Sequence, residues 1–301
     1  MNPLVRGESI RSLLEYHEID KDQGVERIYS YYNKSSYHLH TDKQEVDLVE
    51  SAVWGQMLFL DGVLQSTTRD EILYHNALVH PLLDTLKEKK DILILGGGEG
   101  ATAREVLRWK GVESVVMVEY DKEIVDLMKE KGADWSRGSF NDPRLTVVYE
   151  DAWTYMENNS KDYNGVILDL TDPMLKKEDW KPLLENVIKA VKGIGRGGFV
   201  MNAGLYTPWN TDQLNELKCM IEELCQTYPG FNYYMYTTII PSFNGEWTFI
   251  VVSHKCRHMI NPEHLNVFPP WIRRSIRTLD TTLLNEPINT NPITTEIVSY
   301  V

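Results

Sequence analysis

The chain has 301 residues, 42% of them hydrophobic and 25% charged, and its net charge is −13. This composition is typical of a globular protein with one large domain or two modest ones. An acidic surface repels phosphate backbones, so we expect no nucleic-acid partner, and the charge favours a small cationic one. No apolar run reaches the roughly 20 residues that span a bilayer, and the polar N-terminus is unlike a signal peptide. We therefore expect no membrane partner and a cytoplasmic location.

The first 66 residues predict a small antiparallel β domain. A strand-like pattern runs from Arg27 to about Ser66. Within it Val46–Val53 alternates and is rich in strand-forming residues, and Gln56–Leu60 is an apolar run. Asp61-Gly62 follows directly and is typical of a hairpin turn. We assign residues 1–66 to this N-terminal domain.

From residue 67 onward, helical patterns alternate with short apolar strands. Asp70 to Leu86 has apolar residues at helical spacing, and Thr68 or Asp70 can cap that helix. The predicted strands are Asp91–Leu95, Ser114–Val118, Leu145–Val148, Gly165–Leu168, Gly198–Asn202 and Thr248–Ser253. The predicted helices are Ala101–Lys110, Lys122–Lys131, Ala152–Asn158, Lys181–Val191 and Thr211–Gln226. This alternation predicts a Rossmann-like α/β domain over residues 67–301, with a mostly parallel sheet and helices on both faces.

The C-terminal part adds two further expectations. Cys219, Cys225 and Cys256 form neither a C-x-x-C pair nor a zinc-type spacing, so we expect buried, reduced thiols. The tail after His254 contains several Pro and Thr residues and has little periodicity. It can wrap the domain or join a subunit interface, and the sequence leaves both roles open.

A glycine-rich turn and two acidic strand ends predict a nucleoside site. The strand Ile92–Leu95 runs into Gly96-Gly97-Gly98-Glu99-Gly100 and then into a helix. Glycines at such a turn let backbone amides approach a ligand that side chains would block. Glu119 ends the next strand about 20 residues later, where an acid accepts ribose hydroxyls. Asp151-Ala152 follows a third strand and is placed to accept the adenine amino group, because ligands of open α/β sheets bind at the carboxyl ends of the strands.

Glu99, inside the glycine turn, indicates the charge of the ligand. A dinucleotide site sets a helix N-terminus against a pyrophosphate and uses the spacing G-x-G-x-x-G. Here the third glycine comes early, and a carboxylate in a low-dielectric gap would repel pyrophosphate by on the order of several kcal/mol. A positively charged nucleoside fits better, and adenosyl sulfonium compounds are such nucleosides.

A fourth strand ends at Asp169 and is followed by Leu170-Thr171-Asp172-Pro173. Asp-Pro is also a common loop starter, but Asp169 shares the predicted sheet edge with Glu99, Glu119 and Asp151. Crowded carboxylates are tolerable only with a cation or a proton among them, and an amine substrate supplies the cation. A protonated amine must lose a proton before it attacks a sulfonium carbon. We therefore predict that Asp169 is the catalytic base.

Several segments between about Tyr37 and Ser253 share a more specific pattern. They are Leu60-Asp61-Gly62-Val63-Leu64-Gln65, Arg69-Asp70-Glu71-Ile72-Leu73-Tyr74-His75, the glycine turn with Ala103-Arg104-Glu105-Val106-Leu107, Phe140-Asn141-Asp142-Pro143-Arg144, Asp169-Leu170-Thr171-Asp172-Pro173 and Ile240-Pro241-Ser242. Together they resemble the polyamine aminopropyltransferase family, that is, the spermidine, spermine and thermospermine synthases. The resemblance implies a class I S-adenosylmethionine (AdoMet) methyltransferase fold and an enzyme that transfers an aminopropyl group. The donor would be decarboxylated AdoMet, the acceptor a polyamine, the by-product methylthioadenosine, and the assembly a homodimer or homotetramer.

The resemblance also implies roles for single residues. Asp169 matches the residue that orients and deprotonates the attacking amine. Glu99 matches the carboxylate that holds the ammonium of the donor, which agrees with the physical argument because intact AdoMet would set its own carboxylate against Glu99. Glu119 matches the ribose acid. The remaining donor-binding positions are Gln44, Gly96, Gly98, Asp151 and Ala152, and the acceptor-binding positions are Tyr74, His75, Asp172, Phe243 and Trp247.

The departures from the family pattern concern the acceptor. Many spermidine synthases carry Asp in the glycine turn and Ser-Ser between the two aspartates, whereas Glu99 and Leu170-Thr171 resemble thermospermine synthases. Phe243 stands where the family usually has tyrosine, which removes one polar contact to the amine. The segment after Pro173 is shorter than usual and lacks a common Gly-Pro pair. We slightly favour conversion of spermidine to thermospermine over conversion of putrescine to spermidine.

Two other functions stay open. One is an AdoMet-dependent N-methyltransferase of an amine on the same scaffold, which Glu99 opposes because it would face the carboxylate of AdoMet. The other is a non-catalytic homologue that binds a nucleoside or a partner protein, which the intact Asp169 and Glu119 oppose. We expect no metal cofactor, because the acids lack His and Cys companions and a sulfonium leaving group needs no Lewis acid.

Overall fold

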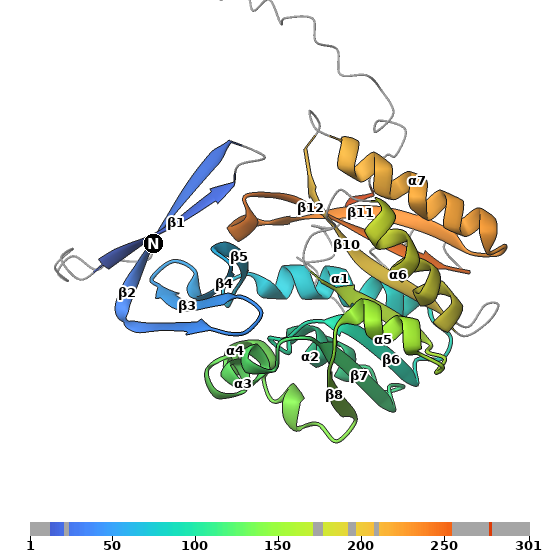
Figure 1. Cartoon of the computed structure of the whole chain (residues 1–301), viewed down its shortest axis with the longest axis horizontal. Coiled ribbons are helices and arrows are strands. Elements are labelled where there is room, and N and C mark those ends of the chain that lie inside the picture. The colour runs from blue at the N-terminus through green and yellow to red at the C-terminus, as the bar shows by residue number, and fades with distance from the viewer. Residues whose placement is uncertain are drawn as a thin grey trace, which may run out of the picture.

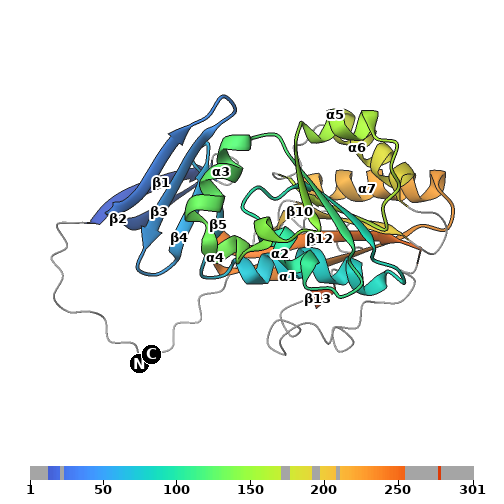
Figure 2. The ribbon, with the colours of Figure 1, turned by 90° about the horizontal axis from the view of Figure 1, so that it is seen from below.

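The protein is described by a computed structural model in which two β-sheets lie next to each other. The described residues are 13–20, 24–170, 177–191, 197–207, 211–254 and 277–278. A small N-terminal sheet stands at one end of the molecule, and a larger sheet carries helices on both faces (Figure 1). Seen from below, helices α3 and α4 lie between the small sheet and the rest of the larger domain (Figure 2).

The small sheet is an antiparallel meander in the order β1-β2-β3-β4-β5. Its strands are β1 Leu13–Asp20, β2 Val25–His40, β3 Glu45–Ser51, β4 Gly55–Leu60 and β5 Val63–Thr67. The predicted hairpin turn is confirmed, since Asp61 and Gly62 have φ angles of 49° and 81°, as a type I′ turn requires. Strand β1 was not predicted, because its charged residues and the exposed Ile19 give no apolar run.

The large sheet has the order β13-β11-β12-β10-β9-β6-β7-β8. The strands from β10 to β8 are parallel, whereas β11, β12 and β13 pair antiparallel. The bounds are β6 Asp91–Gly96, β7 Ser114–Glu119, β8 Leu145–Tyr149, β9 Gly165–Asp169, β10 Gly198–Tyr206, β11 Asn232–Ile240, β12 Gly245–Ser253 and β13 Arg277–Thr278. The prediction of a mostly parallel sheet is confirmed. It missed β11, although the Tyr, Thr and Ile residues of that segment are typical of a strand.

The helices cover the large sheet from two sides. They are α1 Glu71–Thr85, α2 Ala101–Leu107, α3 Lys122–Lys131, α4 Ala133–Ser136, α5 Ala152–Asn158, α6 Lys177–Ala190 and α7 Asp212–Thr227, with short 3₁₀ helices at Ser139–Asn141 and Pro241–Phe243. Helices α5, α6 and α7 lie on one face, and α1 and α2 lie on the other (Figure 2). The predicted bounds of α3 and α5 are confirmed. Helix α2 ends three residues before the predicted Lys110, ahead of Gly111, and α6 starts four residues before the predicted Lys181, so that Pro182 lies inside it.

Alternate residues of β6 face the two helical layers. Ile92 and Ile94 pack in the core cluster that includes α1 and α2, whereas Leu93 and Leu95 pack in the cluster that includes α5, α6 and α7. All four side chains are fully buried. A continuous apolar run of this kind is characteristic of a parallel strand that is covered on both faces.

The expectation that the side chain of Asp70 or Thr68 caps α1 is wrong, because no side-chain capping hydrogen bond forms. Asp70 occupies the N-cap position, but its side chain makes no capping hydrogen bond. Its carboxylate accepts from the Thr67 hydroxyl at 2.7 Å and from the backbone N–H of Ser242 at 2.7 Å. Thr68 accepts from the backbone N–H of Gln56 at 3.0 Å. Both side chains therefore join the start of α1 to other segments instead of capping it.

Little of the C-terminal tail falls within the described residues. Arg277 and Thr278 form β13, which pairs with Thr237 and Tyr236 of β11. Cys225 is half-buried, but the expectation of burial is wrong for Cys219, which is exposed. Cys256 lies outside the described residues. Within the part of the chain that the structure describes, no helix is both long enough and apolar enough to span a membrane.

Candidate active site

The carboxyl ends of β6, β7 and β9 bring the predicted acidic residues together. Gly96 at the end of β6 pairs in register with Asp169 at the end of β9, and β7 ends alongside at Glu119. The glycine turn then carries Glu99 over the same edge. A ring nitrogen of His75 and one carboxylate oxygen each from Glu99 and Asp169 all lie within 4.8 Å of one another. The sequence-based expectation that Glu99 and Asp169 face a common place is confirmed.

Two hydroxyl groups hold the carboxylate of Asp169. Thr102, in the first turn of α2, donates to Oδ2 at 2.6 Å, and Tyr74 of α1 donates to Oδ1 at 3.2 Å. Burial and the nearby charge of Glu99 raise the pKa of Asp169 to about 6, while His75 and the two hydroxyl groups oppose that rise. Asp169 is therefore held in one orientation and titrates close to neutral pH, which suits a base that accepts a proton.

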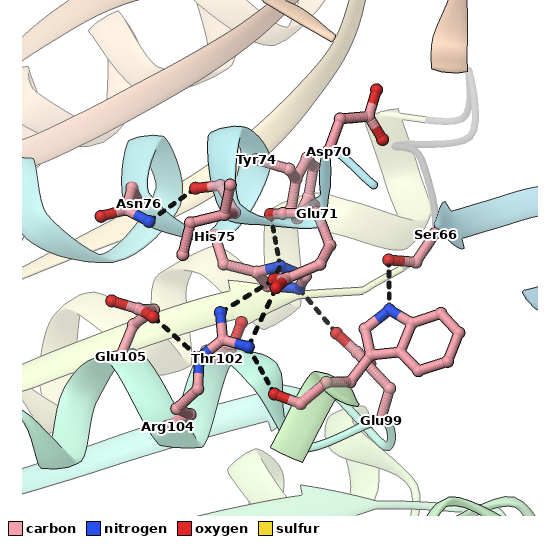
Figure 3. Close-up of polar contacts among 12 residues, drawn as sticks. Ser66, Asp70, Glu71, Tyr74, His75, Asn76, Glu99, Thr102, Arg104 and Glu105 are labelled. Atoms are coloured by element: carbon pink, nitrogen blue, oxygen red, sulfur yellow. Dashed lines mark hydrogen bonds and ion pairs between the residues drawn. The ribbon is translucent and has the colours of Figure 1, made fainter. Parts of the chain in front are cut away.

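His75 lies between two glutamates (Figure 3). Its Nδ1 is 2.9 Å from Oε2 of Glu71, and its Nε2 is 2.7 Å from Oε1 of Glu99. Burial alone would lower the pKa of His75, but the hydrogen bonds to both carboxylates raise it to about 10. Because both ring nitrogens donate, His75 is an imidazolium at neutral pH and supplies positive charge next to Asp169.

Glu71 contacts His75 and is itself held by Arg104, and neither residue was predicted to belong to the site. Arg104 of α2 donates to both carboxylate oxygens of Glu71, at 3.0 and 2.8 Å (Figure 3). It also donates to Glu105 at 2.8 Å. Burial would raise the pKa of Glu71, but His75 and Arg104 hold it below its usual value. Both residues stand in the family-like segments, but charged residues on a helix give no periodic signal of burial.

Close neighbours within the protein require glycine at two positions of the glycine turn. A Cβ on Gly96, whose φ is 84°, would lie 2.1 Å from the backbone oxygen of Asp169. A Cβ on Gly98 would lie 3.0 Å from Oε2 of Glu119. Gly96 and Gly98 were predicted to contact the ligand. In the structure, Gly96 is required by the adjacent strand, and Gly98 allows Glu119 to reach the turn.

Asp121 links Glu119 and Gln44 near the end of β7. Burial, together with the charges of Glu99 and Asp121, raises the pKa of Glu119 to about 7, against backbone hydrogen bonds that lower it. Gln44 comes from the small sheet, where it precedes β3, and is buried. It reaches this edge by hydrogen bonding to Asp121 at 2.9 Å. The structure therefore brings Gln44, which is distant in sequence, next to the predicted ribose acid.

Asp151 and Ala152 open helix α5 at the end of β8. Asp151 is exposed and caps the helix, since its Oδ1 accepts from the backbone N–H of Thr154 at 2.9 Å. Ala152 is buried. The capping bonds engage one carboxylate oxygen of Asp151, Oδ1, which also accepts from the Thr154 hydroxyl at 3.1 Å.

An aromatic wall adjoins Asp169 on the side predicted to hold the acceptor. The ring of Tyr74 lies 6.1 Å from that of Phe243, and Phe243 lies 4.7 Å from Trp247. Trp247 donates its indole N–H to Asn202 at 2.7 Å. These three of the predicted acceptor residues lie together. The fourth, His75, has its ring 5.1 Å from that of Tyr74 and hydrogen bonds to Glu99, and Asp172 lies outside the described residues.

His75, Glu99 and Asp169 also have the types and spacing of metal ligands. Both ring nitrogens of His75 already make hydrogen bonds to carboxylates. A metal ion would have to replace the proton that His75 shares with Glu99. The expectation of a metal-free site stays a prediction.

The strand order and the acid-lined edge define a class I methyltransferase-like α/β fold. Comparison with solved structures agrees with this fold class. The chain is 21% identical to the spermidine synthase from Thermotoga maritima, with a TM-score of 0.76 over 94% of this chain and 98% of that one. It aligns equally well, with a TM-score of 0.76, to a spermidine synthase in complex with the transition state analogue AdoDATO.

Family models and curated relatives go further than the fold. Residues 71–262 match the spermine/spermidine synthase domain, and residues 25–68 match the spermidine synthase tetramerisation domain. The polyamine aminopropyltransferase of Sulfolobus acidocaldarius is 37% identical over 225 residues, which are 74% of this chain and 71% of that protein. The one from Sulfurisphaera tokodaii is 34% identical over 222 residues, with the same coverage. The chain belongs to the spermine/spermidine synthase family.

Proposed function

We propose that this protein is a polyamine aminopropyltransferase that uses decarboxylated AdoMet as donor and releases methylthioadenosine. The observation that carries the proposal is the convergence of Glu99 and Asp169, whose side-chain oxygens lie within 4.8 Å of each other and of His75. Substrate cations offset the repulsion between such acids. Membership of the family and the names of the relatives support the same activity.

In the proposed mechanism Asp169 accepts a proton from the attacking amine. The amine lone pair then forms a bond to the methylene carbon next to the sulfonium, and the carbon–sulfur bond breaks. Its electron pair stays on sulfur, which leaves as the neutral thioether of methylthioadenosine. Thr102 and Tyr74 keep the carboxylate of Asp169 aimed at the amine. The chain contributes mainly position and charge, because the leaving group needs no acid.

Glu99 selects the decarboxylated donor in this proposal. Its Oε1 accepts from His75, and Oε2 can take the ammonium of an aminopropyl group. Intact AdoMet would bring a carboxylate into the same place, against Glu99 and close to Asp169. We propose that Glu119 and Gln44 hold the ribose and that Asp151 and Ala152 hold the adenine.

The acceptor is a polyamine whose methylene chain packs on Tyr74, Phe243 and Trp247. We favour spermidine, with thermospermine as the product, over putrescine. The wall of aromatic rings supports an acceptor with several methylene groups, since Phe243 offers apolar area and no hydroxyl. Asp172 is proposed to bind a second amine of the acceptor.

We further propose a homotetramer or homodimer, a cytoplasmic location and a domain boundary between residues 66 and 67. The match of residues 25–68 to a tetramerisation domain supports the assembly. That match ends three residues before the catalytic-domain match begins, which supports the boundary.

The experiment is a mass analysis of products from putrescine, spermidine, agmatine and longer amines with each donor. Aminopropyl products with decarboxylated AdoMet are expected, and methylated amines from intact AdoMet without them would refute the proposal. Asp169→Asn should lower kcat by at least about 100-fold. Asp162→Asn is the matched control, because Asp162 is exposed and precedes β9 at the opposite sheet edge. Unchanged turnover in Asp169→Asn would rule out the proposed base.

A further inference from the structure

Asp121 is a buried acid next to the donor site that the sequence analysis did not single out. It follows Glu119 by two residues, occupies the N-cap of α3 and is 2% exposed. Its Oδ1 accepts from the backbone N–H groups of Glu123 at 3.0 Å and Ile124 at 3.4 Å. These two bonds account for its role as a helix cap and use only one of its two oxygens.

The second oxygen of Asp121 reaches into the small N-terminal sheet. Oδ2 accepts from the hydroxyl of Thr41 at 2.8 Å and from Nε2 of Gln44 at 2.9 Å. Thr41 and Gln44 form the turn between β2 and β3, and Gln44 follows the end of β2 by four residues. The contact therefore joins two sheets across about 80 residues of sequence. No capping function requires these two bonds.

The backbone of Asp121 holds the predicted ribose acid at the same time. Its N–H donates to Oε1 of Glu119 at 3.1 Å. One residue thus fixes Gln44 and Glu119, which come from different sheets and are both proposed to bind the donor. A shift of the β2–β3 turn would move Gln44 relative to Glu119 unless Asp121 held them in place.

Asp121 also decides which atom of Gln44 faces which partner. A carboxylate only accepts hydrogen bonds, so the amide nitrogen of Gln44 must point to Asp121. The hydroxyl of Tyr120 donates to the amide oxygen of Gln44 at 3.2 Å. The second N–H of the amide is then the group that Gln44 can offer to a ribose hydroxyl oxygen of the ligand. A reversed amide would present oxygen in its place.

We propose that Asp121 is a positioning residue that couples the N-terminal sheet to the donor site, by fixing the place and amide orientation of Gln44 beside Glu119. This inference rests on the proposed function. Its consequence is that donor binding and docking of the small sheet stabilise each other, since both depend on the same contacts.

Asp121→Asn separates positioning from capping. Asparagine caps a helix as well as aspartate does, so Oδ1 can keep its bonds to α3. The new NH₂ group faces the donors of Thr41 and Gln44, which breaks the bridge or forces the amide of Gln44 to reverse. Thr41→Val weakens the same bridge from the other side without changing α3 or Glu119. It also removes the hydroxyl that accepts from the backbone N–H groups of Lys43 and Gln44 within the turn. Lys122→Ala is the control, because it changes an exposed residue of the same helix turn.

The measurements are steady-state kinetics and binding of methylthioadenosine by calorimetry. In Asp121→Asn we expect the KM for the donor to rise about tenfold. A tenfold change in affinity corresponds to the free energy of roughly one net hydrogen bond to a charged group. The KM for the acceptor and kcat should change less than about threefold, and Thr41→Val should shift the donor KM in the same direction. Hydrogen exchange of the β2–β3 turn should slow when methylthioadenosine binds the wild type, and slow less in Asp121→Asn.

Two outcomes would overturn the inference. One is a lowered melting temperature in Asp121→Asn with an unchanged donor KM, which would leave only a structural role. The other is an equal rise of donor and acceptor KM. If the wild type transfers no aminopropyl group, the proposed function fails, but methylthioadenosine affinity in the same variants still tests the coupling.

Discussion

Two substitutions next to Asp169 should move its titration in opposite directions. Glu99→Gln removes a negative charge, and His75→Gln removes a positive one. Burial and the charge of Glu99 raise the pKa of Asp169 to about 6, whereas His75 lowers it. Asp169 acts as a base only when it is ionised, so activity increases as the pH rises through this pKa. Losing Glu99 lowers that pKa, and losing His75 raises it.

The size of the effect follows from the separations. Two unit charges 4.8 Å apart interact by about 3.5 kcal/mol at an effective dielectric constant of ~20. The charges of Glu99 and His75 lie 2.7 Å apart, so each offsets much of the other's field at Asp169. We therefore expect each variant to move the midpoint by about one pH unit, equivalent to about 1.4 kcal/mol.

The assay is kcat/KM for the acceptor between about pH 5 and pH 8, with the donor saturating. Glu99→Gln should also weaken donor binding, so saturation has to be checked at each pH. The acidic limb should move to lower pH in Glu99→Gln and to higher pH in His75→Gln. If both midpoints moved in the same direction, or neither moved, the limb would belong to a group other than Asp169 and the electrostatic reasoning would be wrong.

Three further predictions concern the surroundings of Asp169. Thr102→Val removes a hydrogen bond that lowers the pKa of Asp169, so kcat should fall about tenfold and the acidic limb should move to higher pH; an unchanged pH profile would contradict this. Arg104→Met removes the guanidinium that Glu71 and Glu105 share and leaves them only their histidine partners in the buried network, which should cost about 3–5 kcal/mol of unfolding free energy in urea titrations, and a loss below about 1 kcal/mol would mean that the network adapts. Dialysis against EDTA should leave turnover unchanged, while added Zn²⁺ should inhibit competitively with the donor; activity lost to EDTA and restored by a metal would reverse the expectation of a metal-free site.

The elements that could be predicted are those whose apolar residues recur at a regular spacing along the sequence. The continuous apolar strand before Gly96 and the helix at Lys122–Lys131 follow from residue spacing alone, and both are confirmed. Strand β1 lacks that pattern, because its charged and exposed residues alternate without an apolar face. It forms by pairing with β2, and a pattern search over a short stretch of sequence does not detect pairing between strands.

The candidate site divides in a similar way. The meeting of Glu99, Glu119 and Asp169 could be predicted, because the carboxyl ends of parallel strands share one edge. The position of His75 between two carboxylates could not, since α1 gives no sign of how it rotates over the glycine turn. Asp121 offered one signal, an acid two residues after a strand end and directly before a helix. That signal indicates a cap and says nothing of the second oxygen.

The hydrogen bond from the backbone N–H of Ser242 to Asp70 limits how the acceptor specificity of this protein can change. The bond fastens the short β11–β12 connection, which carries Phe243, to the first residues of α1. A connection fastened at that point cannot swing outward to admit a bulkier molecule. Evolution of a new specificity would therefore proceed by replacing rings such as Phe243 in place, while the path of the chain around them is preserved.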